Sequence, residues 1–92
     1  MVSIETDSVE ARDRVTVIVF APSEVRPREF SFLKTESISA AAKHAATEFG
    51  LHPTDPSFQT KAGDVLDATE TLEQAGVTNG EELDLVDVGG GV

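Results

Sequence analysis

Residues 37–53, SISAAAKHAATEFGLHP, decide the fold of this chain, because the sequence changes there from strand-like alternation to a helical period. Ser37 stands in the position of an N-cap, and Gly50 supplies the left-handed residue that ends a helix. Between them, apolar side chains recur at the spacing of one helix face: Ile38, Ala41, Ala42, Ala45 and Phe49. The stretch therefore predicts one amphipathic helix over Ser37 to Phe49.

Two strand-like segments precede this helix. Residues 14–20, RVTVIVF, are rich in β-branched side chains, with three valines on one face and Thr16, Ile18 and Phe20 on the other. After a loop that contains two prolines, Glu29 to Lys34 alternates again and predicts the second strand of a hairpin.

The remainder of the chain predicts further strands. Two short ones are expected at Phe58 to Lys61 and Val65 to Leu66, followed by a helical turn over Thr71 to Ala75. Asn79-Gly80 marks a tight turn before a last strand, Glu82 to Val88. This order, ββαββ with a short helical turn before the final strand, predicts an α+β fold in which a mixed sheet packs on one helix. The expected core joins the helix face to apolar strand residues: Val15, Val17, Phe30, Phe32, Leu66, Leu83 and Leu85.

Composition limits the possible functions. The chain has 92 residues and no cysteine, which allows one small domain without disulfides or thiolate metal sites. Its 17 acidic and 7 basic residues give a net charge of −10, so we expect repulsion from nucleic acid and anionic membranes and attraction to basic partners. We predict a cytoplasmic protein with an acidic, flexible tail at residues 1–13, a folded domain at 14–88 and a glycine tail at 89–92.

No residue pattern predicts an enzyme or a cofactor. His44 and His52 could join Asp55 as metal ligands, but one histidine lies in the predicted helix and the other in the following loop. Solvated histidines are the expected outcome. Serine, histidine and aspartate all occur, yet a catalytic triad needs a supporting pocket that so small a domain rarely provides. We therefore predict no catalytic and no metal-binding residues.

The glycine run at the end of the last strand is the strongest functional signal. Gly89, Gly90 and Gly91 have no Cβ, so they form a thin, extended segment that could enter a narrow enzyme channel. Val92 follows them. The alternative is that the run is an ordinary frayed terminus.

Residues from the helix to the last strand resemble ubiquitin without a gap, and the resemblance covers Arg14 to Gly91. The segment after Thr71-Leu72 also resembles bacterial ubiquitin-like proteins that occur with ubiquitin-conjugation-type enzymes. The matching positions are Ser37-Ile38, Gly50-Leu51, Pro53, Ala62-Gly63, Leu66-Asp67, Thr71-Leu72, Leu83, Leu85 and Val86. The resemblance implies a ubiquitin-like β-grasp fold.

It also implies a protein modifier. An E1-like adenylating enzyme would activate the terminal glycine, an E2-like enzyme would carry it as a thioester, and an amine of a target protein would receive it. Because Val92 lies beyond Gly91, a metal-dependent, deubiquitinase-like peptidase would first have to remove it. Asp87-Val88 stands where ubiquitin has arginines, so a eukaryotic E1 is not expected to accept this chain.

The resemblance further suggests a partner-binding patch. The positions that align with the apolar patch of ubiquitin, together with neighbouring apolar residues, are Ile18, Val25, Thr60 and Val86. The alternative is that these are ordinary exposed side chains, which occur on every protein surface.

Two other functions stay open beside the modifier. A sulfur carrier would also be activated at a terminal glycine, as a thiocarboxylate, but such carriers usually end on a bare diglycine. A ubiquitin-like binding module would use the fold without any activation. Neighbouring genes for E1-like and E2-like enzymes and a peptidase would favour the modifier, whereas cofactor-synthesis genes would favour the sulfur carrier.

Overall fold

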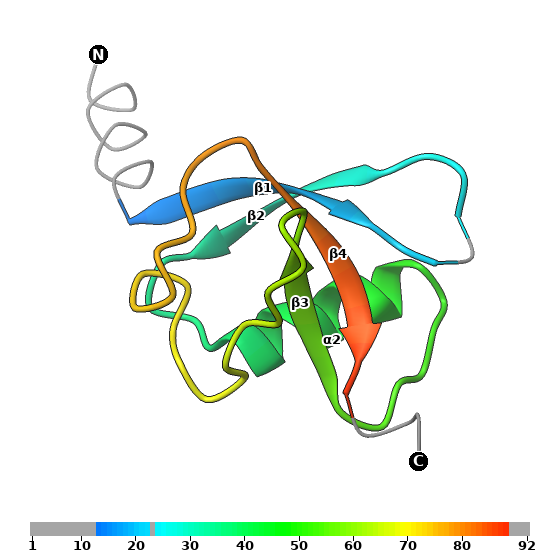
Figure 1. Ribbon diagram of the computed structural model, residues 1–92. Coiled ribbons are helices and arrows are strands. Elements are labelled where there is room, and N and C mark those ends of the chain that lie inside the picture. The colour runs from blue at the N-terminus through cyan, green and yellow to red at the C-terminus, as the bar shows by residue number, and fades with distance from the viewer. Residues whose placement is uncertain (1–12, 23, 89–92) are drawn as a thin grey trace.

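The computed structural model describes residues 13–22 and 24–88, and its elements follow the predicted order ββαββ (Figure 1). Residues 1–12 of the tail predicted at 1–13, and the whole tail predicted at 89–92, lie outside the described residues. The elements are β1 (Arg14–Phe20), β2 (Arg28–Leu33), α2 (Ile38–Glu48), β3 (Pro56–Thr60) and β4 (Glu81–Asp87). Among the described residues, no helix has the length and apolar character needed to cross a membrane.

The four strands form one mixed sheet in the order β2-β1-β4-β3, with α2 across one of its faces (Figure 1). β1 pairs antiparallel with β2 and parallel with β4, and β4 pairs antiparallel with β3. A parallel pair needs a long crossover connection, and here the chain from β2 through β3 supplies it. The mixed sheet on one helix confirms the predicted α+β architecture.

The helix begins and ends where the sequence predicts. The Ser37 hydroxyl accepts a hydrogen bond from the backbone N–H of Ala40 at 3.1 Å, and Gly50 follows the C-cap Phe49 with a φ of +76°. Arg28 adds a contact from β2, because its guanidinium donates to the carbonyl of Glu48 at 3.0 Å and lies 5.2 Å from the centre of the Phe49 ring. A cation at the carboxyl end of a helix is favourable to the helix dipole.

The core lies between α2 and the face of the sheet that it covers. Three expected members, Phe30, Phe49 and Leu66, are only partly buried at its margin. The predicted set also omits six apolar residues that the structure buries: Val19, Ala21, Ala46, Phe58, Leu72 and Val77. Buried apolar side chains come from every element and from the loops between them: Val15, Val17, Val19, Ala21, Phe32, Ile38, Ala41, Ala42, Ala45, Ala46, Phe58, Leu72, Val77, Leu83 and Leu85.

One predicted strand is wrong. Val65 to Leu66 makes a single bridge, between Val65 and Gln59, where the sequence predicts a strand. The turn before it closes tightly on the end of β3, because the Thr60 N–H donates to the Asp64 carbonyl and the Gly63 N–H donates to the Thr60 carbonyl. Too few residues then remain to continue the pairing with β3.

The segment before β4 contains the predicted turns. At Thr71 to Ala75 a single hydrogen-bonded turn forms in which the Thr71 hydroxyl accepts from the Gln74 N–H while the Gln74 side chain accepts from the Thr71 N–H. This reciprocal arrangement is a capping box. The Asn79 side chain then accepts from the Thr16 N–H at 2.8 Å, and Gly80 takes a φ of +82° before β4.

Candidate functional site

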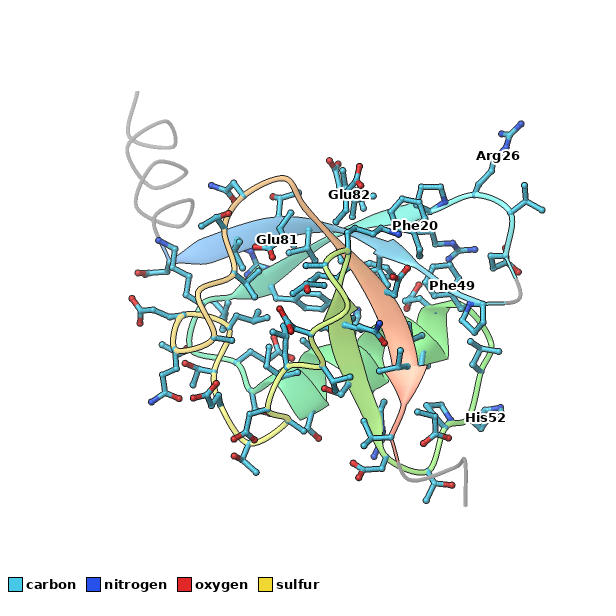
Figure 2. The ribbon with its side chains drawn as sticks, viewed as in Figure 1. Phe20, Arg26, Phe49, His52, Glu81 and Glu82 are labelled. Carbon is cyan, nitrogen blue, oxygen red and sulfur yellow. The ribbon has the colours of Figure 1, made fainter. Side chains whose placement is uncertain are left out.

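The face of the sheet opposite α2 is the candidate interaction surface. On β1, Thr16, Ile18 and Phe20 point to this outer face, while the valines between them are buried. The strand pairing sets Ile18 between two glutamates, with Glu29 of β2 on one side and Glu82 of β4 on the other. Figure 2 shows Glu82 and Phe20 on the side of the sheet away from α2. An apolar side chain here is therefore flanked by two exposed carboxylates.

A lysine lies against Asp84, the next outward residue of β4 after Glu82. The Lys61 ammonium lies 2.9 Å from a carboxylate oxygen of Asp84 and 3.6 Å from the centre of the Phe20 ring. The carboxylate attracts the cation by charge, and the face of the aromatic ring attracts it through its quadrupole. Both side chains of the ion pair remain partly open to solvent, at 44% and 38% exposure.

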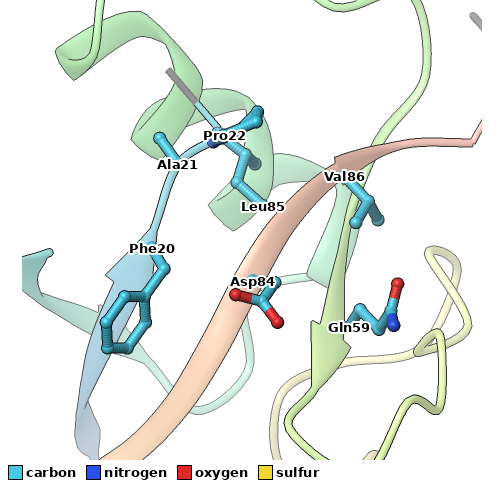
Figure 3. Close-up of a pocket in the computed structure, with 7 residues that line it drawn as sticks. All are labelled: Phe20, Ala21, Pro22, Gln59, Asp84, Leu85 and Val86. Carbon is cyan, nitrogen blue, oxygen red and sulfur yellow. The ribbon is translucent and has the colours of Figure 1, made fainter. Parts of the chain in front are cut away.

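A shallow hollow of about 300 Å³ opens beside Asp84, between the end of β1 and strands β3 and β4 (Figure 3). Most of its lining is apolar or aromatic, with Gln59 and Asp84 as the polar members. The lining residues are Phe20, Ala21, Pro22, Gln59, Asp84, Leu85 and Val86. A second, smaller hollow shares Pro22, Leu85 and Val86 with the first, so the apolar surface continues toward the end of β4.

The structure brings together only part of the patch expected from the sequence. Ile18 and Val86 both lie on the outer face, but Ile18 is opposite Glu82, four residues before Val86, a separation of about 13 Å along the strand. Val25 lies in the loop between β1 and β2 and is 99% exposed. Thr60 is paired with the buried Leu83, so it follows the row that faces α2.

Sequence reasoning missed the residues at the centre of this surface. Gln59, paired with Asp84, holds the outer-face position on β3 beside Thr60. Phe20, Lys61 and Asp84 meet only because the parallel pairing sets Phe20 opposite Asp84. The alternation of β1 already placed Phe20 on the outer face, and this was the one signal that could have identified it.

The second candidate site is the end of β4, from which the chain enters the glycine run. The two carboxylate oxygens of Asp87 accept hydrogen bonds from the backbone N–H groups of Thr54 and Asp55, each at 3.0 Å. The Val88 N–H donates in turn to the Asp55 carbonyl at 2.9 Å. These three bonds tie the strand end to the loop before β3. Gly89, Gly90, Gly91 and Val92 lie outside the described residues.

The histidines are placed as ordinary surface residues. The His44 ring stands edge-on to Phe30 and Phe32, with centroids 6.1 Å and 5.8 Å away, and His52 is exposed in the loop after α2. Within residues 13–22 and 24–88, no group of three histidine, cysteine or acidic side chains is arranged to hold a metal ion.

Comparison with known proteins finds similarity in structure and none in sequence family. No protein-family model matches the sequence, and no curated protein matches it. A solved structure described as "Molecular Mimicry of SUMO promotes DNA repair" superimposes with a TM-score of 0.71 at 12% identity, over 80% of this chain and 91% of the other. A designed protein based on ubiquitin gives 0.70 at 19% identity, over 86% and 94%.

A natural ubiquitin is among the structural neighbours. The ubiquitin of Caldiarchaeum subterraneum superimposes with a TM-score of 0.69 at 22% identity, over 86% of this chain and 99% of that one. At these identities the likeness concerns the fold. Together with the mixed sheet packed on one helix, it shows that this chain has the ubiquitin-like β-grasp fold.

Proposed function

We propose that this chain is a cytoplasmic ubiquitin-like protein modifier and has no enzymatic activity of its own. In this proposal a peptidase cuts after Gly91, an E1-like enzyme adenylates the new terminal carboxylate, and an E2-like enzyme transfers the protein to amines of targets. The ubiquitin-like fold and the glycine run that follows its last strand support the proposal.

The observation that carries it is the fixed end of β4. Asp87 and Val88 are held by three hydrogen bonds to the loop before β3, and the next three residues are all glycine. A run without side chains that starts from a fixed strand end can be presented to a narrow channel in a defined direction.

The chemistry uses the Gly91 carboxylate. One carboxylate oxygen attacks the α-phosphorus of ATP, which gives an acyl-adenylate and releases pyrophosphate. A cysteine thiolate of the E1-like enzyme then displaces AMP to form a thioester, and a cysteine thiolate of the E2-like enzyme displaces that first thiolate to form a second thioester. An amine of the target displaces the thiolate of the E2-like enzyme and loses a proton, which leaves an amide bond. Glycine suits each step because no Cβ hinders attack on the carbonyl carbon.

Three forms of the protein test the proposal: the full chain, a chain ending at Gly91, and the chain ending at Gly91 with Gly91→Phe. With the cognate E1-like and E2-like enzymes and ATP, the chain ending at Gly91 should form a thioester and higher-mass conjugates without any peptidase. The full chain should do so only after losing the mass of one valine residue, seen by intact mass spectrometry. The Gly91→Phe form should do neither, because a bulky side chain blocks a channel shaped for glycine.

Two outcomes would overturn the proposal. If Val92 is retained in the presence of the cognate enzymes and no conjugate forms, the chain is a ubiquitin-like binding module. If the chain ending at Gly91 is adenylated but gains sulfur at its carboxylate in place of an amide bond, the chain is a sulfur carrier.

A further inference from the structure

The outer face carries a repeated pattern that the tail chemistry does not use. The outward residues of β4, taken at every second position, are Glu82, Asp84 and Val86. Each acid is paired across the sheet with an apolar side chain of β1, since Glu82 is opposite Ile18 and Asp84 is opposite Phe20. The row therefore has two acid positions and then an apolar one, with a period of two residues.

The first acid position carries two carboxylates. Glu29 and Glu82 stand on either side of Ile18, and both are exposed. Arg14 also points to this face, but its guanidinium is already bonded to the hydroxyl and the carbonyl of Ser31, which lies two residues after Glu29 on β2. Two carboxylates on both sides of an aliphatic side chain attract a cation that has an apolar stem, as arginine and lysine do.

The second acid position already holds a cation. Lys61 lies over the Phe20 ring and against the Asp84 carboxylate, which shows that the pair is shaped to take a positive group. The ion pair is solvent-exposed, and such pairs contribute little to stability, so another cation can replace Lys61 at small cost. Arginine is the better occupant, because its planar guanidinium stacks on an aromatic ring and bonds a carboxylate in a bidentate manner.

The third outward position of β4, Val86, lines the hollow beside Asp84. Val86 lies at its far side from Phe20, with Pro22 and Leu85 in the wall, and its volume of about 300 Å³ exceeds that of one aliphatic side chain. Burial of an apolar side chain here would remove both surfaces from water.

From this row we propose that the outer face binds an extended basic segment of a partner protein, with the pattern Arg-x-Arg-x-Leu. The first arginine lies between Glu29 and Glu82, the second replaces Lys61 on Phe20 and Asp84, and the leucine enters the hollow. An extended strand also presents every second side chain to one face, so its period matches that of β4. The net charge of −10 adds attraction for a basic partner. Lys61 acts as an internal competitor that the partner must displace.

The test uses the full chain and three short peptides, with binding followed by backbone amide shifts in NMR. The probe is acetyl-Arg-Ser-Arg-Ser-Leu-amide. A neutral peptide, acetyl-Gln-Ser-Gln-Ser-Leu-amide, controls for charge, and acetyl-Arg-Arg-Ser-Ser-Leu-amide has the same composition with the period broken. The probe should bind more tightly than both and should shift the amides of Phe20, Asp84 and Val86 most.

Charge-matched variants separate the site from general attraction. Lys61→Ala should tighten binding about two- to fivefold relative to Lys43→Ala, which removes the same charge from the exposed side of α2. Asp84→Asn should weaken binding about fivefold or more relative to Glu73→Gln, which removes a charge from an exposed turn. Phe20→Leu keeps an apolar side chain but lacks the aromatic face, and should also weaken binding.

Several results would overturn this assignment. Equal affinities of Lys61→Ala and Lys43→Ala would show that Lys61 competes with nothing. Equal affinities of Asp84→Asn and Glu73→Gln, or of the probe and the peptide with the broken period, would show that only net charge matters. No binding of the probe at millimolar concentration to either the native chain or Lys61→Ala would exclude the site. Since the test does not involve Gly91, its failure leaves the proposed function standing, and the reverse also holds.

Discussion

On β4, the inward side chains Leu83 and Leu85 are 0% and 5% exposed, whereas Asp84 and Val86, which alternate with them, remain partly open to solvent. The same alternation occurs on β1, where the valines are buried and Phe20 is not. One face of the sheet is thus closed by α2 and holds the domain together. The other face stays partly open to solvent, and a change of one position along a strand moves a side chain from one face to the other.

The difference between the faces predicts very different costs for similar truncations on one strand. Leu83→Ala removes a fully buried side chain and should destabilise the domain by about 2–5 kcal/mol, a large part of the stability of a small domain. Val86→Ala, three residues further on the outer face, should change the free energy of unfolding by about 1 kcal/mol or less. Urea titrations followed by circular dichroism give both values. Equal losses for the two variants would contradict the assignment of the faces.

The alternation within each strand could be predicted from the sequence, because burial of one face leaves a local period of two in β1 and β4 and a period near 3.6 in α2. The register between β1 and β4 could not. The register depends on the path of the long crossover between the two strands, which no local sequence pattern specifies. The contact of Lys61 with Phe20 and Asp84 therefore could not be predicted. At β3, a shift of one position placed Thr60 in the expected patch where the pairing puts Gln59.

The end of β4 differs from both faces, because polar bonds hold it. Asp87→Ala removes the two acceptors of the Thr54 and Asp55 N–H groups, and should cost about 1 kcal/mol, less than a core truncation, because the freed N–H groups can bond to water. Asp87→Asn keeps one acceptor and should lose less. Hydrogen exchange at Val88 should accelerate in the alanine variant, since the loop that accepts its bond is released. Unchanged protection at Val88 would show that the carboxylate does not fix this strand end.

The smallest expected effect concerns an exposed carboxylate away from both faces of the sheet. The Thr69 hydroxyl donates to Asp67 at 2.7 Å and the Thr69 N–H donates to the same oxygen at 2.9 Å. These two bonds hold the pKa of Asp67 below its ordinary value of 3.8, and the bond from the hydroxyl has the larger effect. Because the pKa of Asp67 is lower in the folded state than in the unfolded state, the ionised carboxylate stabilises the fold. This stabilisation is fully present above pH 3.8 and is lost as the pH falls through the folded-state pKa.

Thr69→Val removes the hydroxyl and keeps the backbone donor, so the pKa of Asp67 should rise toward 3.8, as a carbon-detected NMR titration of its carboxyl group would show. The variant should melt slightly below the native protein at neutral pH. That difference should disappear in acid, because the protonated carboxyl no longer gains from the hydroxyl bond. Thr35→Val makes the same change at another exposed threonine and should leave the Asp67 titration unmoved. A melting difference that persists at a pH below the native pKa of Asp67 would mean that Thr69 stabilises its turn by packing, and that the charge of Asp67 contributes nothing there.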